Sequence, residues 1–84
     1  MKSGLARLEW DNVDSGLWFA GFTGRSISMS LCIEQEPDNT FSASYCQLDK
    51  SEYEKLDSFD NLRLAKRALE QYAVDIDCTT LRRR

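Results

Sequence analysis

The sequence predicts an α+β domain in which a four-stranded antiparallel meander sheet is followed by one amphipathic C-terminal helix packed on one face. Apolar and polar residues alternate with period two over the first half of the chain, and the period becomes helical towards the C-terminus. A chain of 84 residues buries enough surface for one domain and no more. We therefore expect a single domain over residues 1–81 and a basic tail at residues 82–84.

Turn residues separate the four expected strands. The strands are Ala6–Val13, Leu17–Thr23, Ser26–Gln35 and Thr40–Leu48. Gly24-Arg25 fits a two-residue hairpin turn with Gly in first position. That turn pairs Phe22 with Ile27, Ala20 with Met29 and Trp18 with Leu31. The third turn needs three or five residues if the apolar positions of its two strands are to share a face.

The main helix is expected to begin at Asp60, because Asp is a good N-cap residue. Its apolar stripe is Leu62, Ala65, Leu69, Ala73 and Ile76. Earlier in the chain, Ser51-Glu52-Tyr53-Glu54 has the form of a capping box and predicts a turn or two of helix. The main helix would cover six large side chains of the sheet. They are Trp10, Trp18, Phe22, Met29, Phe41 and Tyr45.

The opposite face of the sheet is expected to carry small polar residues around one aromatic side chain, Phe19. The other residues of this face are Leu17, Gly21, Ser28, Ser30, Cys32, Ser42, Ser44 and Cys46. Such a face is ordinary on an exposed sheet, but it could also dock on a partner or on a second copy of the chain. Cys32 and Cys46 would lie directly opposite each other or on a diagonal.

Composition argues against enzyme chemistry. Histidine is absent, which removes the commonest general base and the commonest zinc ligand. Gly21-Phe22-Thr23-Gly24 lacks the pattern of a phosphate-binding loop, and no segment has the spacing of a metal-binding loop. We expect a protein without catalytic residues, cofactor or metal.

Three cysteines without a short spacing indicate reduced thiols, and no apolar run has the length of a signal peptide or a membrane span. These features predict a cytoplasmic protein that does not contact a membrane, either monomeric or homodimeric.

Charge is distributed unevenly along the chain. The net charge of −3 disfavours direct nucleic-acid binding over the molecule as a whole. Residues 32–60 contain eight acids and two bases, a net charge of −6, whereas residues 61–84 carry +3. The acidic stretch is either a solvated surface or a mimic of phosphate charge for a Lys/Arg-lined groove. The candidate partner-binding residues are Glu34, Glu36, Asp38, Asp49, Glu52, Glu54 and Asp57.

Strands rich in Trp and Phe, followed by a helix with a short pattern at its start, resemble many small proteins encoded by bacteriophages and prophages. The pattern is Phe59, Asp60, Leu62, Ala65, Lys66 and Ala68. With this length and acidity, the chain is similar in kind to anti-CRISPR proteins, the type I-E class among them. The resemblance implies a stoichiometric inhibitor, active in the host bacterial cytoplasm, that binds a subunit or nuclease of a CRISPR-Cas effector complex. It assigns no role to any residue.

Two alternatives remain open. The layout also resembles the small sheet-plus-helix DNA-binding domain at the start of some phage integrases, which implies a DNA-binding accessory or transcriptional module. Its expected contacts are Arg25, Arg63, Lys66, Arg67 and the Arg82–Arg84 tail. That mode requires basic side chains on the sheet, and this sheet offers serines instead. The other alternative is a homodimeric structural protein that packs through the serine face around Phe19.

Overall fold

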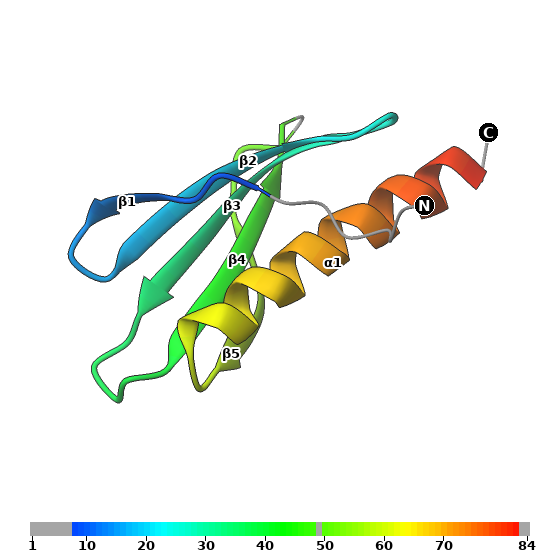
Figure 1. The fold of residues 1–84 in the computed structure, drawn as a ribbon. Coiled ribbons are helices and arrows are strands. Elements are labelled where there is room, and N and C mark those ends of the chain that lie inside the picture. Colours follow the sequence, from blue (N-terminus) through cyan, green and yellow to red (C-terminus); the bar gives the residue numbers. More distant parts are fainter. Residues whose placement is uncertain (1–7, 49, 83–84) are drawn as a thin grey trace.

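Five strands and one helix form the fold seen in a computed structural model, which describes residues 8–48 and 50–82. The strands form an open antiparallel sheet in chain order, and the helix follows them (Figure 1). The elements are β1 (Asp11–Asp14), β2 (Leu17–Thr23), β3 (Ser28–Gln35), β4 (Phe41–Gln47), β5 (Glu54–Phe59) and α1 (Leu62–Arg82). The predicted α+β class and the C-terminal helix are confirmed, but the sheet has five strands and not four.

The short helix that the pattern at residues 51–54 predicted does not form; the chain continues through a connection into the fifth strand, β5. β5 pairs with β4 from Phe41 opposite Phe59 to Tyr45 opposite Glu54, and its Leu56 and Phe59 pack against the core. The capping-box pattern acts only locally, whereas the edge of β4 presents unpaired N–H and C=O groups that a further strand satisfies. Tertiary pairing therefore outweighs the helix signal.

The hairpin between β2 and β3 differs from the prediction by two residues. Its loop is residues 24–27, closed by the Gly24 N–H, which donates to the Ile27 carbonyl at 2.8 Å. The observed partners are Phe22 with Met29, Ala20 with Leu31 and Trp18 with Ile33. Because side chains alternate with period two, this shift leaves every residue on its predicted face. The loop between β3 and β4 has five residues, one of the two expected lengths.

The first predicted strand is too long at its start. Leu8, Glu9 and Trp10 precede β1 without strand structure, and the beginning of the predicted strand, residues 6–7, lies outside the described residues. β1 pairs with β2 through a bulge between Asn12 and Asp14. The third and fourth strands also begin later than predicted, at Ser28 and Phe41.

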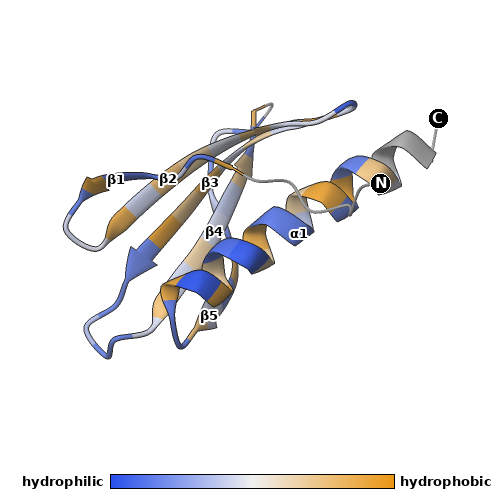
Figure 2. Ribbon diagram, viewed as in Figure 1, coloured by the Kyte–Doolittle hydropathy of each residue, from blue (hydrophilic) through white to orange (hydrophobic). Residues whose placement is uncertain are grey.

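α1 begins one residue later than expected, because Asn61 and not Asp60 forms the N-cap. The Asn61 Oδ1 atom accepts a hydrogen bond from the Leu64 N–H at 2.9 Å. The helix extends to Arg82, and residues 83–84 of the expected basic tail lie outside the described residues. Hydrophilic and hydrophobic residues alternate around the helix, as an amphipathic element requires (Figure 2).

The core lies between α1 and one face of the sheet, to which β2 contributes Phe22, while the helix contacts β3, β4 and β5 directly. Ala65, Leu69 and Ala73 of the predicted stripe are fully buried. Of the six large side chains that were expected beneath the helix, Phe22 and Met29 belong to the core, and the other four are partly buried and pack against it. Within the described residues, no helix is both long and apolar enough for a membrane crossing.

Chain connections alternate between the two ends of the sheet. In an antiparallel meander, the β1–β2, β3–β4 and β5–α1 connections share one end, while the β2–β3 and β4–β5 connections share the other (Figure 1). This alternation decides which charged residues become neighbours.

Candidate binding surfaces

Acidic residues gather where three connections meet at one end of the sheet. We call this surface the acidic end, and its residues are Asp14, Glu34, Glu36, Asp38 and Asp60. Glu34 pairs with Leu17 directly after the β1–β2 turn, and the Gln35 N–H donates to the Gly16 carbonyl at 2.7 Å. Asp60 follows Phe59, which pairs with Phe41 at the start of β4. Neighbouring strands are roughly 4.8 Å apart, so the three connections that carry these acids lie at the same end of one sheet.

The seven acids predicted to bind a partner do not form one surface. Glu34, Glu36 and Asp38 lie at the acidic end, but Glu52 and Glu54 lie at the opposite end of the sheet. Asp57 lies within β5 and Asp49 lies outside the described residues. Sequence reasoning grouped these residues because they are close in the chain.

Asp14 and Asp60 belong to the acidic end but were not among the acids predicted to bind a partner. The signal for Asp14 was available, because the first and third turns of any antiparallel meander share an end. Asp60 joins them only because β5 places the connection to α1 at this end of the sheet.

Two of these carboxylates also hold their own turns. Asp14 Oδ1 accepts a hydrogen bond from the Ser15 N–H at 2.7 Å. Asp38 Oδ1 accepts from both the N–H and the hydroxyl of Thr40, at 3.1 and 2.6 Å. The hydrogen bonds from Thr40 lower the pKa of Asp38 below its ordinary value, so its charge persists in mild acid.

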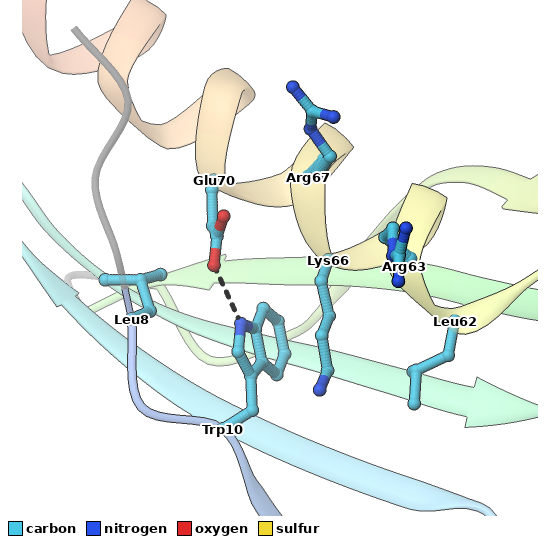
Figure 3. A pocket seen from close by; sticks show the side chains of 7 residues that line it. All are labelled: Leu8, Trp10, Leu62, Arg63, Lys66, Arg67 and Glu70. Carbon is cyan, nitrogen blue, oxygen red and sulfur yellow. Dashed lines mark hydrogen bonds between the residues drawn. The ribbon is translucent and has the colours of Figure 1, made fainter. Parts of the chain in front are cut away.

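Three bases of α1 line a groove beside the segment that precedes β1. We call it the basic groove; its volume is about 460 Å³ (Figure 3). Its residues are Leu8, Trp10, Leu62, Arg63, Lys66, Arg67 and Glu70. The Trp10 Nε1–H donates to Glu70 Oε2 at 3.0 Å, which joins the N-terminal segment to the helix.

The structure therefore brings together Arg63, Lys66 and Arg67, three of the predicted alternative contact residues. Sequence analysis placed Trp10 in the core and missed its part in the groove, since nothing local indicates that its ring also borders the helix bases.

Arg25, the fourth predicted base, lies at the other end of the sheet in the β2–β3 loop. Its backbone N–H donates to the Asp77 carboxylate at 3.0 Å, together with the N–H groups of Ser26 at 2.7 Å and Ile27 at 3.2 Å. These bonds, the one from Ser26 above all, lower the pKa of Asp77. Asp77 is 8% exposed, so this loop is anchored to α1.

Glu54 takes part in a structural contact. The Tyr45 hydroxyl donates to Glu54 Oε1 at 3.0 Å and accepts from the Tyr72 hydroxyl at 3.0 Å. The Tyr72 bond, burial and the Glu54 carboxylate all raise the pKa of Tyr45. Glu54 therefore links β5 to the core.

The open face of the sheet carries the residues predicted for it, with one addition from the β4–β5 connection. The Tyr53 hydroxyl lies 2.6 Å from Ser30 Oγ, and its ring meets the Phe19 ring edge-on with centroids 6.5 Å apart. Cys32 and Cys46 are diagonal neighbours on this face and are free thiols. Burial raises the pKa of the Cys32 thiol, which keeps it protonated.

Among the residues that the structure describes, no group of three or more His, Cys, Asp and Glu side chains is arranged to hold a metal ion. Comparison with protein-family models, with curated proteins and with solved structures finds no match to this chain.

Proposed function

We propose that the protein is a stoichiometric inhibitor that binds a nucleic-acid-binding complex of its host through the acidic end. The convergence of acidic residues on three adjacent connections carries this proposal, because the fold concentrates there a charge that the net value of −3 conceals. The anti-CRISPR resemblance names the class of target, a CRISPR-Cas effector complex.

Electrostatics supports this use of the acidic end. A channel that holds nucleic acid is lined by Lys and Arg, and a row of carboxylates offers such a channel part of the charge that phosphates offer. Exposed Glu34 and Asp38 can approach a partner without rearrangement of the sheet. Binding of this kind would compete directly with target DNA and would weaken as salt rises.

Inhibition of purified effector complexes tests the proposal, with the type I-E complex first. We expect the protein, at a one-to-one ratio with the complex, to block the binding and cleavage of a fluorescent target duplex. The double variant Glu34→Lys/Glu36→Lys should inhibit about tenfold less well, because charges opposite a complementary surface contribute strongly to recognition.

Glu52→Lys/Asp75→Lys is the matched control. It makes the same change in net charge, but its two positions lie in the β4–β5 connection and in the second half of α1. We expect it to inhibit within about threefold of the natural protein, since exposed charges away from the contact act weakly.

Unchanged DNA binding and cleavage in the presence of excess protein would remove the CRISPR-Cas target. An equal loss of inhibition in both double variants would show that inhibition depends on net charge and not on the acidic end. If both double variants inhibit fully and Phe19→Ala does not inhibit, the contact lies on the open face of the sheet and not at the acidic end.

A further inference from the structure

We propose that the basic groove binds a short segment of single-stranded nucleic acid, with one base stacked on Trp10 and the neighbouring phosphates on Arg63, Lys66 and Arg67. This site is separate from the acidic end and does not depend on the function proposed above.

The shape of the groove suits a stacked base. Its volume of about 460 Å³ lies within the roughly 300–1,000 Å³ range of small-molecule sites. The bond from Trp10 Nε1 to Glu70 fixes the indole ring, and Figure 3 shows this ring between Leu8, Glu70 and the Lys66 side chain. A ring that is already held in place loses little entropy when a base stacks on it.

The charges of the groove suit phosphate. Its lining carries three bases and one acid, and that acid already accepts the indole N–H. Lys66 and Arg67 follow Arg63 by three and four residues, so each lies about one helical turn, roughly 5.4 Å along the axis, from Arg63. The net charge of the chain, which disfavours nucleic acid overall, does not describe this surface.

Helix stability does not account for the base in the first turn. Arg63 lies in the first turn of α1, which contains no acid, and Lys66 and Arg67 follow in the second. Cations close to a helix N-terminus oppose the helix dipole, whereas a bound anion there interacts favourably with both the dipole and the bases. A bound phosphate would therefore make this arrangement of bases energetically favourable.

A single strand fits better than a duplex. Stacking on Trp10 requires an unpaired base, since the bases of a duplex are already stacked on one another. The acidic end, which includes Asp60 beside the start of α1, would repel a long duplex that extended past the groove. An acidic peptide could neutralise the same bases, and the experiment separates it from nucleic acid.

Fluorescence polarisation with labelled oligothymidylate of twelve nucleotides tests the proposal on the full chain. We expect saturable binding at 50 mM salt, with log affinity falling against log salt with a slope of about −2 for three phosphate contacts. Trp10→Leu should weaken binding about fivefold or more through the loss of stacking, while Trp10→Phe should retain most of it. Lys66→Gln/Arg67→Gln should weaken binding and bring the slope to about −0.7.

Arg25→Gln is the control, because it removes a base at the opposite end of the sheet and should leave binding unchanged. Circular dichroism confirms that each variant is folded.

Absence of binding at 50 mM salt overturns the proposal. So does equal affinity of folded Trp10→Leu and the natural protein, or an unlabelled polyglutamate peptide that displaces the oligonucleotide as well as unlabelled oligothymidylate does. Because no effector complex is present, the result is independent of the inhibition experiment.

Discussion

At the scale of single residues, Asp77 joins α1 to the β2–β3 loop through its side chain. Its carboxylate accepts backbone N–H groups from three successive residues of the β2–β3 loop and the Ser26 hydroxyl at 2.8 Å. A side chain at Gly24 would overlap this carboxylate, which explains glycine at that position. An acid near a helix C-terminus is unfavourable to the helix dipole, and the N–H groups of the loop offset that cost.

Asp77→Asn should therefore lower the free energy of unfolding at pH 7 by about 2–3 kcal/mol, because an amide N–H₂ cannot accept the loop N–H groups. The pKa of Asp77 is lowered in the folded state from its ordinary value of 3.8. The stabilisation is therefore complete only well above the ordinary pKa of 3.8 and is lost as pH falls through the folded-state pKa. Urea unfolding at pH 7 and pH 2.5 measures both effects, and the difference in stability between the two proteins should be smaller at the lower pH.

Asp75→Asn is the control for that experiment. Asp75 is exposed and, among the residues that the structure describes, accepts a hydrogen bond from the Gln71 side chain at 2.8 Å, so its loss should change stability by less than about 0.5 kcal/mol. A difference between Asp77→Asn and the natural protein that persists unchanged at pH 2.5 would contradict the role assigned to the carboxylate.

At the scale of elements, the start of α1 shows that the N-cap residue depends on the tertiary structure as well as on residue type. Asp60 and Asn61 are both good N-cap residues, and the sequence favours Asp60. β5 ends at Phe59, which pairs with Phe41, and the chain turns into the helix only after Asp60, so the side chain that accepts the Leu64 N–H is that of Asn61. The Ala65 N–H donates to the Asn61 carbonyl at 3.2 Å, which completes the first turn.

Asn61→Ala is expected to lower the free energy of unfolding by about 1 kcal/mol, the usual cost of losing an N-cap. Asp60→Ala, one residue earlier, should change it by less than about 0.5 kcal/mol. Chemical denaturation of both variants measures the difference. The reverse order of effects would restore Asp60 as the cap.

At the scale of the whole molecule, an open sheet leaves two edge strands, β1 and β5. All four residues of β1 are exposed, and Val13 is 55% exposed. Unpaired edges recruit other chains unless charge or irregularity prevents it. Asp11, Asp14 and the bulge between β1 and β2 provide both safeguards.

Asp11→Val should therefore promote association through β1, with an apparent mass in light scattering that rises with protein concentration. Asp75→Val removes the same charge from the exposed surface of α1 and should not have this effect. Equal association of both variants would mean that hydrophobicity or net charge, and not the strand edge, drives it.

Much of the fold could be predicted from the sequence. The period-two alternation places each described residue of β2, β3 and β4 on its correct face, and the helical stripe identifies Ala65, Leu69 and Ala73 as buried. The two-residue register shift arose because the loop closes around Asp77, a contact between residues more than 50 positions apart. No local pattern contains such a contact.

The candidate surfaces were predicted less well for the same reason. Chain proximity grouped Glu34 with Glu52, but the alternation of connections in the sheet sends them to opposite ends. The three helix bases were identified from the sequence, whereas Trp10 joined them only through its bond to Glu70, 60 positions away.

The sequence by itself determined the period, and hence the faces, of the strands and helix, because the direction of a side chain depends on its own backbone and near neighbours. It also determined the charges available and the absence of histidine. Only the tertiary structure decided that residues 54–59 form a strand, that Asn61 caps the helix, and which charges share a surface. Those outcomes depend on contacts between distant segments, whose free energies outweigh local preferences once the layers pack.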